Sequence, residues 1–310
     1  MITVLRAPPF ATVQDLGRPG HLEAGVPPAG ALDRFSLAIA NLLVGNPRGA
    51  AGLEWGLGAG TLRFECALSF TLTGAHAEAM LGGRSIELGK VAEAAPGDVL
   101  DVHRPDRGAW LYVTVAGGID VPLVLGSRST YLPGRFGGIE GRILRSGDRL
   151  PVGVSPERRA AEKHDPLHVS AEPRDEVIRI LPGPDHGNLS TGEWDRFLDA
   201  EYRVSRAASR MGYRLEAAGA GPSVAQDRPS APVCLGTVQL PAGGEPIVLL
   251  ADGPTVGGYS RIAVVASADV GRLAQRRPGD PVRFRPIDLV EARRALRDQT
   301  AVLDRLESGA

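Results

Sequence analysis

Two short segments in the first half of the chain carry side chains that could act on a small polar molecule. In the first, Gln14, Asp15 and Arg18 stand within five residues of one another beside Gly17. Glutamine offers a donor and an acceptor, aspartate accepts, and arginine donates a fork of N–H groups to oxygens. The segment could therefore orient an amide or a carboxylate. On composition alone, a polar turn whose aspartate caps the local backbone is the favoured alternative.

The second segment is the run GSRST at residues 126–130, which follows the apolar run VPLVL. Ser127 and Arg128 could supply hydroxyl and guanidinium donors to an oxyanion or carboxylate. The glycines at 137, 138 and 141 precede Arg142 and could let the backbone approach a ligand closely. No GxxxxGK[ST] pattern is present, so a Walker-type nucleotide site is not predicted. A surface turn with a solvated arginine fits the same residues equally well.

In the second half, the candidates follow strand-like runs. Gln239 lies in the run TVQL, and Asp252 follows the apolar run IVLLA, which would place its carboxylate at the end of a strand. The Asp-Gly-Pro sequence that begins at Asp252 is also typical of an ordinary turn. The six histidines and two cysteines show no metal-ligand spacing, so no metal site is predicted.

Composition excludes several classes of partner. The 35 basic and 36 acidic residues leave a net charge of -1, which predicts no nucleic-acid partner. The apolar runs fall far short of the ~20 residues that span a bilayer, and the N-terminal residues do not resemble a signal peptide. We therefore expect no membrane association. The two distant cysteines fit a reducing compartment, which predicts a cytoplasmic protein.

Hydrophobic runs bounded by glycine, proline or aspartate predict a mainly β protein. Strands are expected at Ile2–Leu5, Thr61–Phe64, Leu68–Leu72, Val99–Val102, Trp110–Val115, Val177–Leu181, Thr237–Leu240, Ile247–Leu250, Ile262–Val265 and Val282–Phe284. Helices are expected after an Asp33 N-cap up to Gly45, at Glu193–Ala200 and at Leu289–Leu306. The polar stretch 155–174 is the predicted linker between two β-rich domains, 1–154 and 175–310.

Three turns share one form, Pro-Gly-Asp or Ser-Gly-Asp, at residues 96–98, 146–148 and 278–280. In each, glycine is expected to adopt a positive φ and aspartate to bond back to the local backbone. Taken singly they are ordinary β-turns, but together they hint at related β-units in the two halves.

A set of segments in collinear order covers nearly the whole chain: residues 12–18, 25–27, 30–33, 40–46, 53–54, 73–75, 116–119, 126–130, 137–142, 181–184, 210–215, 239, 247–252 and 257–259. On these segments the chain resembles the family of 5-oxoprolinase C subunits. This family is also called biotin-dependent carboxyltransferase or KipA-like, and it is related to allophanate hydrolase subunit 2.

The resemblance implies a mainly β fold with two cyclophilin-like β-barrel domains, few helices and a C-terminal helix. It also implies a subunit of an ATP-dependent 5-oxoprolinase complex that hydrolyses 5-oxo-L-proline to L-glutamate. The implied partners are proteins that resemble the A and B subunits of 5-oxoprolinase, and the implied substrate is a small polar amide. ATP would be bound by the complex and need not be bound by this chain.

Carried over residue by residue, the resemblance implies a catalytic set and a substrate-binding set. The catalytic set is Gln14, Asp15, Arg18, Ser127 and Arg128; the substrate-binding set is Asp33, Asn41, Glu54, Arg142, Gln239, Asp252, Tyr259 and Arg261.

Two alternatives remain open. The chain could be the carboxyltransferase subunit of a biotin-dependent urea or amide carboxylase, or a non-catalytic KipA-like regulatory protein. Biotin would have to come from another chain, because no Ala-Met-Lys-Met lysine is present and the only lysines are Lys90 and Lys163. Second-half motifs depart from the family pattern at Ser209, at residues 230–232 and at residues 254–261, which suits a different amide or a loss of activity.

Overall fold

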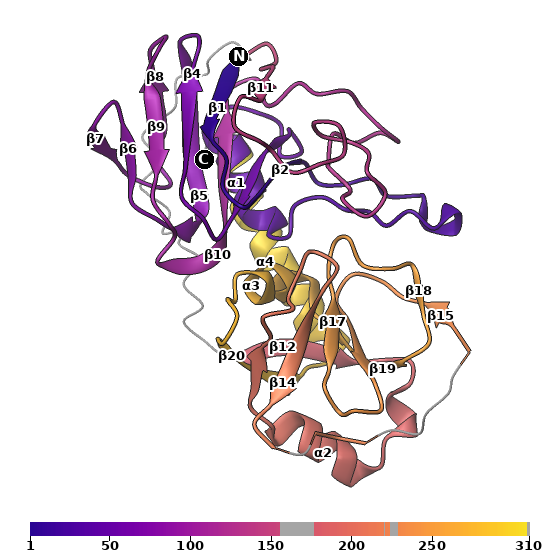
Figure 1. Cartoon of the computed structure of the whole chain (residues 1–310). Helices are drawn as coiled ribbons and strands as arrows, with labels where there is room; N and C mark the ends of the chain where they lie inside the picture. The colour runs from indigo at the N-terminus through magenta and orange to yellow at the C-terminus, as the bar shows by residue number, and fades with distance from the viewer. Residues whose placement is uncertain (156–176, 220, 224–228, 309–310) are drawn as a thin grey trace. The chain divides into compact units, whose positions relative to one another are not determined.

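The computed structural model describes residues 1–155, 177–219, 221–223 and 229–308 (Figure 1). The chain divides into two compact units. The first contains Met1–Arg18, Ala29–Glu172 and Ala301–Ala310, and the second contains Pro19–Pro28 and Pro173–Thr300. Apart from Ser155, the predicted linker lies outside the described residues. Its bounds and those of the two predicted domains stay a prediction.

The first unit contains two antiparallel sheets. The six-stranded sheet has the order β11 (Arg149–Leu150), β1 (Ile2–Arg6), β4 (Gly60–Phe64), β9 (Val99–Val102), β6 (Ala79–Leu81), β7 (Arg84–Ile86). The five-stranded sheet has the order β2 (Phe10–Gln14), β3 (Gly52–Gly56), β10 (Arg107–Val115), β5 (Leu68–His76), β8 (Ala92–Ala94). Apolar side chains from both sheets form one buried core, because alternate residues of a strand point to opposite faces.

One face of the five-stranded sheet is polar and yet buried. Cross-strand pairing aligns Thr12 with Glu54, Glu54 with Tyr112, and Tyr112 with Thr73. We call this the polar sheet face, and its members are Thr12, Gln14, Glu54, Thr71, Thr73, Tyr112 and Thr114, all at most 2% exposed. The opposite face presents apolar residues such as Val13, Leu53 and Val113 to the core.

Helix α1 (Arg34–Leu43) packs on β5 and β10 and covers the part of the polar sheet face that these two strands carry. The hydroxyl of Thr73 donates to the carbonyl of Ser36 over 2.8 Å. Asp33 caps the helix, as the sequence predicts, by accepting a hydrogen bond from the Ser36 N–H. Gly45, with φ of 79°, follows its end. The helix therefore sits where its N-terminal residues meet polar groups of the sheet.

The second unit is a closed barrel. Its order is β12 (Val177–Pro182), β19 (Ser260–Val265), β16 (Thr237–Leu240), β17 (Ile247–Leu249), β14 (Gly212–Ala217), β13 (Tyr202–Val204), β20 (Pro281–Pro286). A two-stranded ribbon, β15 (Ala231–Pro232) with β18 (Val256–Gly257), is added to it.

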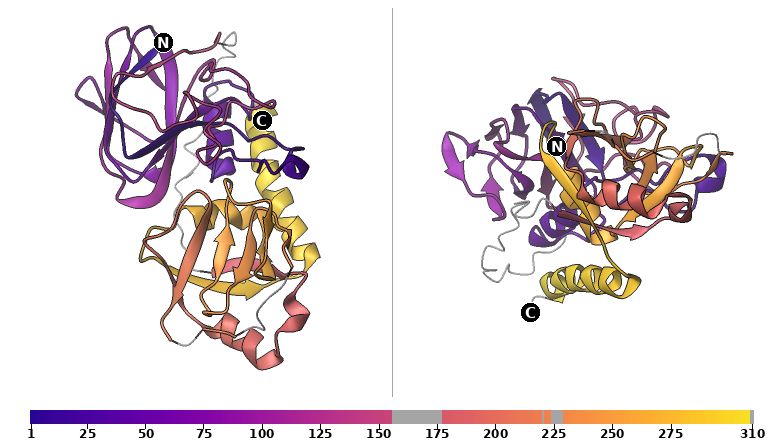
Figure 2. Two further views of the ribbon diagram at one scale, coloured as in Figure 1. Left: turned by 45° about the vertical axis from the view of Figure 1, so that its right-hand side comes forward. Right: turned by 90° about the horizontal axis from the view of Figure 1, so that it is seen from below.

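The helices outside the barrel wall are short except for the last. They are α2 (Thr191–Asp199), α3 (Val270–Ala274), α4 (Leu289–Ser308) and the 3₁₀ turns η1 (Leu22–Ala24), η2 (His186–Asn188) and η3 (Ser267–Asp269). Figure 2 shows α4 as one long helix at the end of the chain. The predicted mainly β fold with few helices and a C-terminal helix is confirmed, as are all ten predicted strands within a few residues.

The three Gly-Asp turns have the predicted conformation. Their glycines, Gly97, Gly147 and Gly279, have φ between 91° and 94°. In each turn the aspartate carboxylate accepts a hydrogen bond from the backbone N–H three residues earlier, at 2.7–2.8 Å. The same local chemistry therefore closes one turn in the second unit and two in the first.

Candidate functional site

The two polar segments of the first half converge at the end of β2. The Asp15 carboxylate accepts hydrogen bonds from the hydroxyls of Ser127 (2.6 Å) and Ser129 (2.5 Å). It also accepts from the backbone N–H groups of Gly17 (2.7 Å) and Arg128 (2.6 Å). We call these five residues the Asp15 cluster. Residues more than a hundred positions apart are joined here through one carboxylate.

The contacts of Asp15 give it the geometry of a positioning residue. It is 7% exposed, and four donors surround its two oxygens. The Ser127 hydroxyl is equally engaged, because it donates to Asp15 and accepts from the Ser129 N–H over 3.0 Å. A general base or a nucleophile needs an accessible lone pair. In this conformation the two side chains hold the loop in place.

Gln14 lies in a strand and not in the polar turn that the sequence suggests. Its Nε2 donates to the Thr12 hydroxyl (3.0 Å) and to the Thr130 carbonyl (3.1 Å). Its Oε1 is buried and has no hydrogen-bond partner within the described residues. Both faces of β2 are buried from Ala11 to Gln14, so the strand lacks the alternation of exposed and buried residues that reveals most strands.

The two arginines of the predicted catalytic set differ in exposure. Arg18 is 1% exposed; its guanidinium donates to the Ser129 carbonyl and lies 5.0 Å from the centre of the Phe136 ring. The Arg128 side chain is 33% exposed and pairs with Asp120 at 2.6 Å. Its Nε is buried and has no hydrogen-bond partner in the described part of the chain. Arg128 is therefore the arginine of the set whose side chain reaches the surface.

The glycines at 137–141 pack against the neighbouring loop. A Cβ on Gly137 would lie 2.0 Å from the Ser129 carbonyl oxygen, and one on Gly138 would lie 2.0 Å from the Thr130 hydroxyl. Their lack of a side chain is thus required by internal packing, and they do not form the open cradle that a phosphate needs. The residues of this loop do not fit an ATP phosphate site.

Arg142, which follows this loop, forms ion pairs with Asp148 and Glu140. It donates to Asp148 over 2.7 and 3.0 Å and to Glu140 over 3.0 Å. Hydrogen bonds from Arg142 lower the pKa of the Asp148 carboxyl. Because Asp148 also closes one of the three Gly-Asp turns, Arg142 braces that turn.

Asp33 and Glu54 belong to a buried network at the base of α1. Glu54 accepts hydrogen bonds from the Leu32 N–H (2.7 Å) and the Tyr112 hydroxyl (2.8 Å). The same hydroxyl accepts from the Asp33 N–H over 2.8 Å. Burial, reinforced by the nearby carboxylates of Glu54 and Asp33, raises the pKa of Tyr112 well above its usual range. Tyr112 is therefore a neutral bridge between helix and sheet.

Asn41 joins the end of α1 to the segment that follows it. Its Nδ2 donates to the carbonyls of Ala50 (2.7 Å) and Arg48 (3.3 Å), and its Oδ1 accepts from the Asn46 side chain (3.1 Å). Both ends of the Asn41 side-chain amide are therefore hydrogen-bonded within the protein. This predicted substrate-binding residue has a structural role in this conformation.

In the second unit, Asp252 forms a buried ion pair with Arg210. The two side chains are 1% and 7% exposed, and Arg210 donates from both Nε and Nη2 at 2.9 Å. The backbone N–H of Asp252 also donates to the Arg210 carbonyl. This pair fixes the chain after β17.

The other second-half candidates gather beside the β15–β18 ribbon. Gln239 on β16 pairs with Arg261 on β19. Arg261 donates to Asp185 from Nε (2.8 Å) and Nη2 (3.3 Å), and from Nη1 to the Pro232 carbonyl (2.9 Å). The hydrogen bond to Asp185 raises the pKa of Arg261. Tyr259, which is 52% exposed, follows the ribbon strand β18.

Sequence reasoning missed Asp185 among these residues. The available signal was its position directly after the Leu-Pro-Gly-Pro run at 181–184, one of the stretches that carry the family resemblance.

A family model for the carboxyltransferase domain, subdomains A and B, matches residues 24–286. The chain belongs to this carboxyltransferase-domain family. It is 41% identical to the 5-oxoprolinase C subunit of Escherichia coli strain K12, over 99% of this chain and 97% of that protein. It is 34% identical to the 5-oxoprolinase C subunit of Haemophilus influenzae, with the same coverage.

Among solved structures, the family fold is seen in the urea carboxylase of Kluyveromyces lactis. That structure matches 99% of this chain with a TM-score of 0.85 at 30% identity. The carboxyltransferase-family chain spans only 29% of that larger enzyme, whereas it spans nearly the whole of the two bacterial subunits.

The structure thus divides the predicted site residues of this carboxyltransferase-family chain into groups. The catalytic set gathers around the Asp15 cluster in the first unit, and Gln239, Tyr259 and Arg261 gather in the second. Within these units, Asn41, Arg142 and Asp252 each belong to a separate structural contact.

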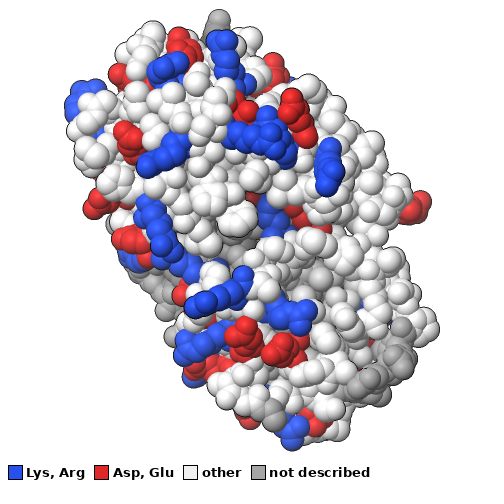
Figure 3. All heavy atoms as spheres, viewed as in Figure 1, with Lys and Arg blue, Asp and Glu red and all other residues white. Residues whose placement is uncertain are grey.

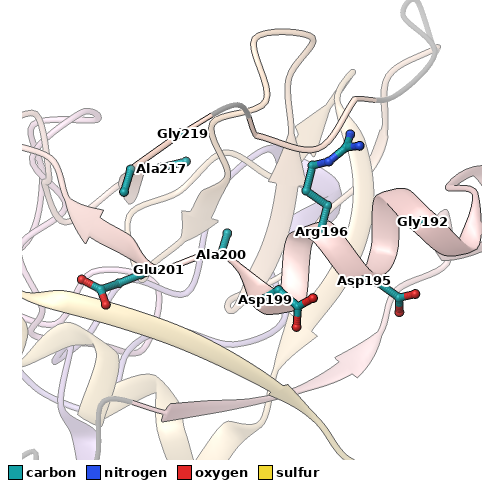
Figure 4. Close-up of a pocket in the computed structure, with 9 residues that line it drawn as sticks. Gly192, Asp195, Arg196, Asp199, Ala200, Glu201, Ala217 and Gly219 are labelled. Carbon is teal, nitrogen blue, oxygen red and sulfur yellow. The ribbon is translucent and has the colours of Figure 1, made fainter.

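A further hollow lies in the second unit, with a volume of about 500 Å³. It is lined by Gly192, Asp195, Arg196, Asp199, Ala200, Glu201, Ala217, Ala218 and Gly219, and none of these is among the predicted site residues. Figure 4 shows the carboxylates of Asp195 and Asp199 pointing away from the Arg196 guanidinium. Glu201 is held by Arg203 and Arg283. An acidic hollow of this kind does not by itself identify a ligand.

Surface charge and metal-binding groups give no second candidate. Figure 3 shows acidic and basic side chains interspersed on the viewed face. Across the residues that the structure describes, no group of three or more histidine, cysteine, aspartate or glutamate side chains is placed to hold a metal. None of the helices in the described ranges combines the length and apolar composition needed to cross a membrane.

Proposed function

We propose that this chain corresponds to the C subunit of an ATP-dependent 5-oxoprolinase, a complex that hydrolyses 5-oxo-L-proline to L-glutamate. The observation that carries the proposal is the 41% identity to a protein named as the C subunit of 5-oxoprolinase, over almost the full length of both chains. Because that relative is named as one subunit of several, we expect partners that resemble the A and B subunits of such an enzyme. We place the complex in the cytoplasm.

The chemistry requires a site that holds a flat amide and stabilises negative charge as its carbonyl is attacked. Arg128 is the side chain in the Asp15 cluster best suited to the second task, because it carries the positive charge of the cluster and its side chain is 33% exposed. Asp15 fixes the Arg128 backbone through a 2.6 Å hydrogen bond. We assign charge stabilisation to Arg128, and we assign positioning to Asp15, Ser127, Gln14 and Arg18.

We assign ATP to the partner subunits. The glycine loop at 137–141 is closed by internal packing, so it offers no phosphate cradle. A test of this assignment is direct: the isolated chain should not bind ATP in a calorimetric titration, whereas the assembled complex should.

The central test is reconstitution. The chain is co-expressed with proteins that resemble the A and B subunits, and ATP-dependent glutamate release from 5-oxoproline is measured. Removing one oxyanion donor typically lowers kcat by ~10²–10³, so Arg128→Ala should fall by about a hundredfold or more. Arg104→Ala, an exposed arginine in the same unit, serves as the matched control and should retain full activity. Glutamate release by the partners without this chain would refute the proposal.

One alternative has specific support. The family model describes a carboxyltransferase domain, and the fold matches a urea carboxylase. In that case the complex would transfer carboxylate from biotin, carried by another chain, to urea or a related amide. Biotin-dependent carboxylation of urea without glutamate release from 5-oxoproline would establish this alternative. Tight partner binding without turnover of any amide would instead favour a regulatory protein.

A further inference from the structure

Gln239 carries a buried side-chain amide that the fold does not use. The residue is 4% exposed, and its Nε2 has no hydrogen-bond partner within the described residues. Gln14 differs in that its Nε2 makes two hydrogen bonds and only its Oε1 is unpaired. Buried polar groups are almost always paired, and an unpaired one destabilises the folded state. An unused amide in the barrel wall therefore points to a partner from outside the chain.

The surroundings of Gln239 leave room for its amide. Gly257 of the β15–β18 ribbon lies over it, and a Cβ on Gly257 would be 2.4 Å from Nε2. Any side chain at this position would displace the amide. The ribbon consists of two residue pairs, Ala231 with Gly257 and Pro232 with Val256, and the Pro232 carbonyl also accepts a hydrogen bond from Arg261.

Arg261 adds a cation beside this amide. It is the cross-strand partner of Gln239, and Asp185 and the Pro232 carbonyl fix its guanidinium. These contacts use three of the five N–H groups that an arginine carries, which leaves two donors in a fixed orientation. Guanidinium N–H groups donate charge-assisted hydrogen bonds to carboxylate oxygens.

We propose that the Gln239 carboxamide recognises the N–H and C=O edge of a small cis amide that carries a neighbouring carboxylate, held by Arg261. This inference rests on the proposed function and names the residues that select its substrate. In a lactam, the ring forces N–H and C=O to the same side of the amide bond. A primary carboxamide presents N–H and C=O in the same way, so the two groups pair through two hydrogen bonds. An open-chain trans amide presents them on opposite sides and cannot form this pair.

The test uses the reconstituted complex. Gln239→Ala and the near-isosteric Gln239→Glu are compared with wild type for 5-oxoproline and N-methyl-5-oxoproline, which lacks the N–H. Wild type should strongly prefer the unmethylated lactam. Both variants should raise KM for 5-oxoproline by about tenfold or more and lose most of that preference. Gly257→Ala should act in the same direction. Arg214→Ala, an exposed side chain on β14, should change neither quantity.

The outcomes separate this inference from the proposed function. If wild type releases glutamate but KM and the methyl preference are unchanged in both Gln239 variants, the inference is overturned and the proposed function stands. If wild type releases none, the proposed function fails, and calorimetric titration with 5-oxoproline, 2-pyrrolidinone and urea decides the inference. Tenfold weaker binding of any of these by Gln239→Ala supports it. Equal binding by variant and wild type, or no binding by wild type, overturns it.

Discussion

Replacing Asp15 by alanine should unfold the first unit at a markedly lower urea concentration. The substitution removes the acceptor of four hydrogen bonds. The two serine hydroxyls can rotate toward other acceptors, but the N–H groups of Gly17 and Arg128 cannot. These two N–H groups are partly buried. A donor left unpaired in such a place costs roughly 1–3 kcal/mol, so we expect a loss of about 4 kcal/mol in the free energy of unfolding.

Equilibrium urea unfolding followed by tryptophan fluorescence measures this loss. Trp55 and Trp110 belong to the first unit and Trp194 to the second, so a Trp194→Phe background reports the first unit alone. With a urea m-value of about 2 kcal/mol per M, the midpoint should fall by about 2 M. The matched control is Asp120→Ala.

Asp120 is an exposed carboxylate of the same region, since its side chain is 54% exposed and pairs with Arg128 at the surface. Surface ion pairs contribute little, so its loss should stay below about 1 kcal/mol. If Asp15→Ala shifted the midpoint no more than Asp120→Ala does, the cluster would not hold the loop and the positioning role would be wrong.

Two further stability predictions follow. Tyr112→Phe removes the hydroxyl between Asp33 and Glu54, so the urea midpoint should report a loss of about 2 kcal/mol, and a change under 0.5 kcal/mol would contradict the bridge. Burial would raise the pKa of Asp269, but hydrogen bonds from Arg179 and the positive charges of Arg272 and Arg179 together lower that pKa. A carboxyl whose pKa is lowered by folding stabilises the folded state at pH values above its unfolded pKa of about 3.9. That contribution is lost as the pH falls through the folded-state pKa. Asp269→Asn should therefore be clearly less stable than wild type at pH 7, with a difference that shrinks below about pH 4.

Much of the fold could be predicted because local rules govern it. The Asp33 cap, the Gly97 turn and the Val99–Val102 strand each depend on residues within a few positions. Strand β3 (Gly52–Gly56) escapes prediction, since it has glycine at both ends and a glutamate inside. Its side chains are buried on both faces, so no alternation marks it. The two-residue strands of the ribbon are too short to leave any pattern.

The candidate site was predictable in its members more than in their roles. The family resemblance puts Asp15 and Ser127 in one catalytic set, and the two side chains do contact each other at 2.6 Å. Their exposure could not be predicted, because it depends on residues far away in sequence. Gln239 and Gly257 show the same limit. Only the folded barrel reveals that the missing side chain of Gly257 leaves space for the Gln239 amide.

The five-stranded sheet carries hydrogen-bonding groups on one buried face and hydrocarbon on the other. A slip of one residue between β2 and β3 would turn Gln14 toward the apolar core and Val13 toward the polar sheet face. Most sheets oppose such a slip only by exposing apolar groups to water. Here misalignment would also bury polar side chains among apolar ones. The Thr130 carbonyl and the Leu32 N–H would lose their hydrogen-bond partners at the same time. Both faces of the sheet therefore favour the observed strand register. This register in turn fixes the position of the loop that follows β2.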